Sequence, residues 1–282
     1  MRTALTIAGS DSSGGAGIQA DLKTFAAHGV YGASVITAVT AQNTLGVTAV
    51  HVVPSAMVRA QIDAVISDLG ADAIKIGMLA TADIVRTVAE AIDAHLLRAE
   101  AIAAHIVRGE AIAAHALRPV VLDPVMVAKG GSRLLAADAV EAVRSLLLAR
   151  CAIVTPNLAE AEVLTNTTVR DVPAMEQAAR ALVDAGAGAA LIKGGHLDDD
   201  RVVDVLWTGD ERHVFEGPRI DTRHTHGTGC TLSSAIAARL ALGEPLAAAV
   251  TLAIDYVREA IAHAPGLGKG HGPLNHFPKS SQ

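Results

Sequence analysis

The chain has 282 residues, which is enough for one large α/β domain with a sizeable core. Its net charge is −6, and its acidic and basic residues are interspersed without a basic patch, so we do not expect nucleic acid as a partner. No apolar run is long enough for a membrane helix and no signal-peptide pattern occurs, so we do not expect a membrane as a partner either. Two cysteines are too few for a disulfide framework, which predicts a cytoplasmic protein.

Short β-rich runs alternate with longer helical runs along the chain. Several of the strand candidates are apolar almost throughout, as expected for strands that are covered on both faces. This alternation predicts a three-layer α/β sandwich, in which helices cover both faces of a mostly parallel sheet, as one domain over residues 1–282. The clearest helices are 55–70 and 233–243, and the predicted strands are 4–9, 33–39, 47–53, 73–77, 119–125, 152–157, 189–195 and 202–207.

Residues 89–118 are three near-copies of one decamer, AEAIDAHLLR, AEAIAAHIVR and GEAIAAHALR. Successive copies on a helix are rotated by about −80°, so their apolar positions cannot share one face. We therefore predict that one copy is native and that the two surplus copies would add roughly 30 Å of helix. The surplus copies would extend a helix, fold as a hairpin that breaks near Gly109, or be partly disordered. A partner-binding arm is the functional alternative.

The histidines of the repeats, at positions 95, 105 and 115, lack the i, i+4 spacing of a helical metal pair. The repeats also precede a strand, and so belong to the N-terminal edge of the sheet. Ligands bind at the opposite edge of such sheets, so we expect the surplus to affect stability more than chemistry.

A Gly/Ser-rich turn follows the first strand. Residues 15–20 fit the pattern G-x-G-x-x-A, but the acidic residue that a dinucleotide site needs about 20 positions later is missing. The turn is not a P-loop either, since no G-K-[ST] follows. It predicts a close approach of the backbone to a small substrate. Asp21 would accept a hydrogen bond from a substrate amine, or would favour the helix N-terminus electrostatically.

The segment HTHGTGC places glycines directly before a helix that begins near Cys230. Free N–H groups and the helix dipole favour an anion there, as in phosphoryl transfer. The same position predicts a lowered thiol pKa for Cys230, which would let it act as a base on a substrate hydroxyl. The alternative is a small buried apolar side chain.

Four charged or polar residues lie at or just after the ends of predicted strands. Asn157 and Glu160 lie three apart at a helix start, which fits either a capping box or a carboxylate that holds Mg²⁺. Asp123 and Lys193 end apolar strands, where the sites of α/β sheets gather. They would serve Mg²⁺ and a phosphate, respectively.

Taken together, these segments resemble the ribokinase-like superfamily, and within it the hydroxymethylpyrimidine/phosphomethylpyrimidine kinases of thiamine biosynthesis. The resemblance spans nearly the whole chain, and the decamer repeat is its clear departure. The segments that carry it are AGSDSSGGAGIQADLKTF, TAVTAQNTLGV, KIGML, VVLDPVMVAKGG, TPNLAEAE, LIKGGH, THGTGCTLSSAIAA and GHGPLNHF.

The resemblance implies roles for matching residues. Asp21 and Gln42 would bind the pyrimidine, in a pocket lined by Gly9, Met78 and Val125. The side chain of Gln42 offers both a donor and an acceptor to an aminopyrimidine.

The resemblance also implies ATP and Mg²⁺ as cofactors and a homodimer as the assembly. Glu160 and Asp123 would organise Mg²⁺, while Lys193, Asn157 and Thr225 would contact ATP or its phosphates.

Catalysis would fall to the segment Gly227, Thr228 and Gly229, which forms the anion hole, and to Cys230 as base, under a flap at 128–131. Two alternatives remain open. One is a kinase of pyridoxal or pyridoxine, and the other is a catalytically silent pyrimidine sensor.

Overall fold

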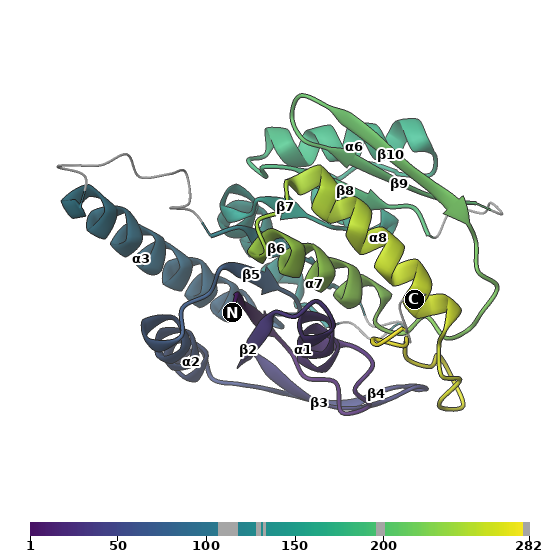
Figure 1. The fold of residues 1–282 in the computed structure, drawn as a ribbon, viewed down its shortest axis with the longest axis horizontal. Coiled ribbons are helices and arrows are strands. Elements are labelled where there is room, and N and C mark those ends of the chain that lie inside the picture. The colour runs from purple at the N-terminus through teal and green to yellow at the C-terminus, as the bar shows by residue number, and fades with distance from the viewer. Residues whose placement is uncertain (107–117, 128–130, 132–133, 196–200, 279–282) are drawn as a thin grey trace.

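An eight-stranded sheet forms the centre of the computed structural model (Figure 1). The structure describes the chain except residues 107–117, 128–130, 132–133, 196–200 and 279–282. All neighbouring strands are parallel except β9, which runs antiparallel to both its neighbours. The order is β10 (Arg212–Pro218), β9 (Arg201–Trp207), β8 (Ala190–Lys193), β7 (Ile153–Val154), β6 (Val120–Leu122), β5 (Ala73–Ile76), β1 (Thr3–Ala8) and β2 (Tyr31–Ile36).

Helices cover both faces of this sheet, so the predicted three-layer α/β architecture is confirmed. One face carries α1 (Gly17–Ala27), α7 (Thr228–Ala241) and α8 (Leu246–Ala262). The other face carries α2 (Ser55–Asp68), α3 (Ala82–Ile106), α4 (Ala137–Ala142), two short helical turns at Val143–Leu147 and Leu148–Arg150, α5 (Leu158–Thr165) and α6 (Val172–Asp184). Among the described helices, none is long and apolar enough to cross a bilayer.

The strands divide their side chains between two cores. In β1, Leu5 and Ile7 join the core under α2 and α3, whereas Ala4 joins the core under α7 and α8. This alternation is the period-two pattern of a strand that is buried on both faces. Small residues such as Ala235 and Ala238, both fully buried, bring α7 close to the sheet.

A separate two-stranded sheet, β3 (Ala38–Asn43) with β4 (Gly46–Val52), lies beside the N-terminal half. The strand predicted at 33–39 therefore spans the end of β2 and the start of β3. Thr37 separates the two strands, and its Oγ1 donates a hydrogen bond to the carbonyl of Met78 at 2.6 Å. Strand β10 was not predicted, because an edge strand with mixed polarity lacks an apolar run.

Helix α3 contains the first decamer and most of the second. Its 25 residues span about 37 Å, and its C-terminal end extends beyond the layers (Figure 1). Residues 89–106 of the repeat are thus helical, and the extension of the helix by the surplus copies stays a prediction. The predicted break near Gly109 lies outside the described residues.

The first copy contacts the body of the protein. Ile92 is buried in the core, and Asp93 receives two hydrogen bonds from Arg150, from Nε at 2.7 Å and from Nη2 at 2.5 Å. The Nε2 of His95 lies 2.9 Å from Oδ1 of Asp63 on α2. The second and third copies carry Ala103 and Ala113 where the first carries its aspartate, so neither can make the same ion pair.

The repeats and the predicted chemistry lie at opposite ends of one strand. The third copy ends directly before β6, whereas Asp123 directly follows it. The position predicted for the insertion, at the N-terminal edge of the sheet, is therefore confirmed.

Deleting residues 99–118 should leave a folded protein. Ile92, Asp93 and His95, which hold α3 on the body of the protein, all lie before residue 99, so the deletion retains their contacts. Thermal unfolding of the deletion variant should occur at the same temperature as in the full chain or higher.

Adding Asp93→Ala to the deletion variant gives a matched test of the docking contact. Loss of the partly exposed pair with Arg150 should reduce the free energy of unfolding by about 1 kcal/mol. Failure of the simple deletion variant to fold would show that the surplus copies are structural.

Candidate active site

A cavity of about 1070 Å³ opens where the parallel strands end. It is lined by residues that follow β1, β6 and β8, and by the N-terminal turns of α1 and α7. Loops at the carboxyl ends of parallel strands and free N–H groups at helix starts make this edge the natural ligand site of such a sheet.

Two loops that are distant in sequence interlock at the cavity. Gly227 has φ of 83°, and a Cβ there would lie 1.8 Å from the carbonyl oxygen of Gly15. Only glycine permits both this conformation and this approach. Beside the contact, Nε2 of His226 lies 2.8 Å from Oδ2 of Asp11.

Asp11 fixes the shape of the first loop. Its carboxylate accepts hydrogen bonds from the backbone of Ser13, Gly15 and Ala16. Burial acts to raise its pKa, but the hydrogen bonds from His226 and Ser13 prevail and lower the pKa to about 2. Sequence reasoning missed Asp11 and His226. Their position directly beside the two glycine segments was the available signal.

Four of the five residues predicted to bind the pyrimidine line the cavity: Gly9, Gln42, Met78 and Val125. Gln42 reaches it from β3, with its Nε2 at 3.4 Å from Nε2 of His226.

Asp21 is the exception, because it lies fully buried beneath the cavity. Its Oδ2 accepts from Thr6 Oγ1 at 2.6 Å and from Lys75 Nζ at 3.0 Å, and its Oδ1 accepts from Ser234 Oγ at 2.6 Å. These partners use both oxygens of the carboxylate. In this structure Asp21 therefore does not line the cavity, and its predicted contact with a substrate amine stays a prediction.

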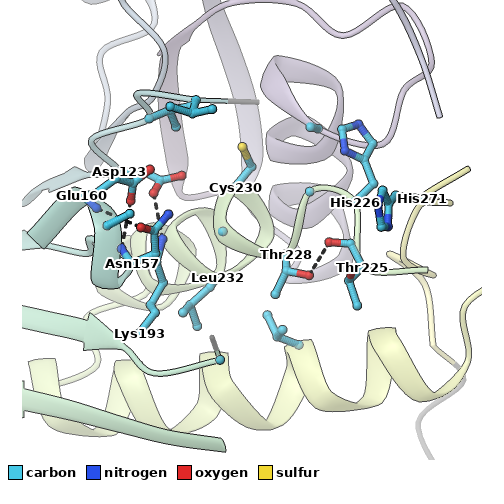
Figure 2. Close-up of a pocket in the computed structure, with 18 of the residues that line it drawn as sticks. Asp123, Asn157, Glu160, Lys193, Thr225, His226, Thr228, Cys230, Leu232 and His271 are labelled. Atoms are coloured by element: carbon cyan, nitrogen blue, oxygen red, sulfur yellow. Dashed lines mark hydrogen bonds and ion pairs between the residues drawn. The ribbon is translucent and has the colours of Figure 1, made fainter. Parts of the chain in front are cut away.

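The predicted anion hole lies at the start of α7. Gly227 is the N-cap, Thr228 is the first helical residue, and Oγ1 of Thr228 donates to the carbonyl of Thr225 at 2.7 Å (Figure 2). A Cβ at Gly229 would lie 3.1 Å from Nζ of Lys193. The absence of a side chain there leaves space for a phosphate beside the lysine.

Cys230, the third residue of α7, lines the cavity between the two groups of polar residues in Figure 2. Its predicted low pKa is wrong. Burial raises the pKa of the thiol to about 12, although the charge of Lys75 and the N–H of Gly17 act to lower it. Loss of water around the thiolate outweighs the favourable helix position.

A charged cluster lies at the other end of the cavity (Figure 2). Nζ of Lys193 donates to Oδ1 of Asp123 at 3.1 Å. Asn157 and Glu160 form a complete capping box for α5, so the structural interpretation is confirmed. Both residues also line the cavity, and the metal role of Glu160 stays a prediction. Burial, with a contribution from Asp123, raises the pKa of Glu160 to about 7 against the opposing charge of Lys193.

Apolar side chains form the wall beyond this cluster. They come from β9 and α8. The sequence did not assign these residues to the site, because apolar positions on a strand or a helix resemble those of an ordinary hydrophobic core. These residues are Val202, Ile254, Val257 and Ile261. The flap predicted at 128–131 lies, apart from Gly131, outside the described residues.

The family model described as phosphomethylpyrimidine kinase matches residues 11–107 and 95–275. The two matched ranges overlap inside the decamers, as expected if a segment that the family has once occurs here more than once. The chain is 49% identical to the hydroxymethylpyrimidine/phosphomethylpyrimidine kinase of Rhizobium meliloti, over 97% of this chain and 96% of that protein.

Solved structures agree with this result. The phosphomethylpyrimidine kinase of Clostridium difficile superimposes with a TM-score of 0.76 at 40% identity, over 93% of this chain and all of that one. An ADP complex of Bacillus subtilis pyridoxal kinase gives 0.85 at 36% identity, over 99% of this chain and 98% of the other. The chain therefore belongs to the phosphomethylpyrimidine kinase family.

Proposed function

We propose that the protein transfers the γ-phosphoryl group of ATP to the hydroxyl of 4-amino-5-hydroxymethyl-2-methylpyrimidine, and then to its monophosphate. One observation carries the proposal. A single cavity is lined by Gln42, Met78 and Val125, by Lys193 with apolar residues of α8, and by the glycine-rich start of α7. We assign the first group to a smaller pocket for the substrate and the second to an arm for ATP. Phosphoryl transfer requires such alignment of two ligands beside an anion site.

The pyrimidine would lie in the smaller pocket. Gln42 can offer a donor and an acceptor to the aminopyrimidine edge, and Met78 and Val125 can pack against its faces. A Cβ at Gly9 would come 3.0 Å from Sδ of Met78, so a larger residue there would close the pocket.

ATP would occupy the other arm. Val202, Ile254 and Val257 provide an apolar surface for the adenine. Lys193 would meet the phosphates as a point charge, together with the hydroxyl of Thr225 and the amide of Asn157.

Asp123 and Glu160 are the residues that fit Mg²⁺. Both are buried carboxylates on the cavity wall. Within the described residues no group of three or more His, Cys, Asp or Glu could hold a metal. A pair of carboxylates fits an ion that keeps several waters and binds substrate phosphates. When bound, Mg²⁺ would neutralise phosphate charge.

In the transfer step, the hydroxymethyl oxygen forms a bond to the γ-phosphorus while the bond to ADP breaks. Backbone N–H groups of Thr228 and Gly229 would stabilise the charge on the transferred group. Cys230, as thiolate, would accept the hydroxyl proton. Because the thiol pKa is about 12, the thiolate fraction, and with it the turnover, would increase as pH rises towards that value.

A transfer assay with Mg·ATP tests the proposal directly. Hydroxymethylpyrimidine should give mono- and diphosphate products, and pyridoxine in a parallel reaction should give much less product. Preferential phosphorylation of pyridoxine would favour the vitamin B6 kinase. No transfer from a well-folded protein would favour the sensor.

Cys230→Ala should lower turnover by about a hundredfold or more, the usual contribution of a general base. ATP affinity should be retained, because the thiol does not belong to the ATP arm. The variant should also lose the rise of turnover with pH. Unchanged turnover would remove Cys230 from the role of base.

We also propose that the protein is a cytoplasmic homodimer. Both cysteines are free, and the β3–β4 hairpin exposes apolar side chains at Val39, Leu45 and Val50. Burial of this surface against a second copy would remove it from water.

Val50→Asp should shift the protein towards monomer in light scattering, because it places a charge in the apolar surface. Val163→Asp on α5 is the matched control, since Val163 is similarly exposed but distant in sequence from the hairpin. An equal effect of both substitutions, or of neither, would contradict the proposed interface.

A further inference from the structure

An ion pair lies completely buried beneath Cys230. Nζ of Lys75 and Oδ2 of Asp21 are 3.0 Å apart, and neither side chain is exposed to solvent. The proposed transfer step makes no use of either residue. A buried pair of this kind is often no more stabilising than apolar side chains of similar volume, so stability alone is a weak explanation for it.

The pair connects the elements that hold the thiol. Asp21 belongs to α1, Lys75 to β5 and Thr6 to β1, and the hydroxyls of Thr6 and Ser234 both donate to Asp21. Ser234 lies on α7 one turn after Cys230, so it shares a helix face with the thiol. Asp21 thereby ties the helix that carries Cys230 to the sheet.

The start of α1 also acts on the thiol. The N–H of Gly17, the first residue of that helix, acts to lower the pKa of Cys230. Asp21 lies one turn further along α1. The carboxylate of Asp21 therefore links α1, on which it lies, to α7, which bears the thiol.

We propose that the Lys75–Asp21 pair is a positioning element for Cys230: Asp21 holds the two helices in register, and Lys75 places a permanent positive charge near the thiol. This rests on the proposed role of Cys230 as base. Lys75 would stabilise the negative charge that the sulfur carries before it accepts the hydroxyl proton.

The charges near Cys230 act in opposite directions. Lys75 favours the thiolate, whereas Asp123 and Asp21 disfavour it, and Lys75 has the largest effect of the three. Lys193 also interacts electrostatically with the thiol. Removing the charge of Asp21 should therefore make the thiol more acidic, and removing that of Lys75 should make it less acidic.

Alkylation of Cys230 by iodoacetamide, followed by mass spectrometry at a fixed pH, measures the thiolate fraction without any phosphoryl transfer. Asp21→Asn should accelerate the reaction and Lys75→Met should slow it, each by about tenfold, as for the loss of a nearby charge. Shifts in the same direction, or rates equal to that of the unmodified protein, would overturn the proposal. A general loosening of the structure would accelerate alkylation in both variants.

Cys151 provides the internal control, because it is a buried thiol in the opposite core layer. Its alkylation should stay slow in every variant that remains folded. If a single variant opens, the double variant Asp21→Asn/Lys75→Met, which buries no unpaired charge, decides the question. It should react more slowly than the unmodified protein, because the effect of Lys75 exceeds that of Asp21. An equal or faster rate would reject the proposal.

The alkylation result is separate from the outcome of the transfer assay. Opposite shifts with no phosphoryl transfer would support the charge arrangement and reject the kinase function. Transfer that depends on Cys230, without opposite shifts, would support the kinase and reject the positioning pair.

Discussion

The site depends on the close contact between the loop after β1 and the loop before α7. Gly15 and Gly227 bring the two backbones together, and the Asp11–His226 hydrogen bond holds them there. One loop leads into α1 and the other into α7, so this contact sets the relative position of two helix N-termini. Each N-terminus supplies free N–H groups, and their convergence makes the region suited to negative charge.

Several residues of the site have two roles, one in the fold and one in the cavity. Glu160 completes a capping box and also presents a carboxylate to the cavity. Its high pKa shows the cost of this double position, since the carboxylate is buried near Asp123. A nearby cation would relieve that cost, so binding of Mg²⁺ and ionisation of Glu160 would favour each other.

Much of the fold could be predicted from the sequence, because apolar strands such as β5 and β8 are distinct from amphipathic helices. The ends of β6 and β8 also led to Asp123 and Lys193, which both line the cavity. Burial could not be predicted. Asp21 follows a glycine turn in the way a ligand-binding residue would, but its partners Lys75 and Ser234 come from distant segments. The pKa of Cys230 was misjudged for the same reason, because the helix position is visible in sequence and the loss of solvent is not.

The attachment of α3 through its first decamer has a consequence for how the gene can change. Asp93 and His95 anchor the helix before the surplus begins, and β6 resumes the sheet after it, on the edge away from the cavity. Closing a longer connection is inexpensive, since each doubling of a flexible loop adds only about 0.6 kcal/mol. Whole decamers can therefore be gained or lost in frame at this point, which makes it a natural position for length variation and for the insertion of a foreign sequence.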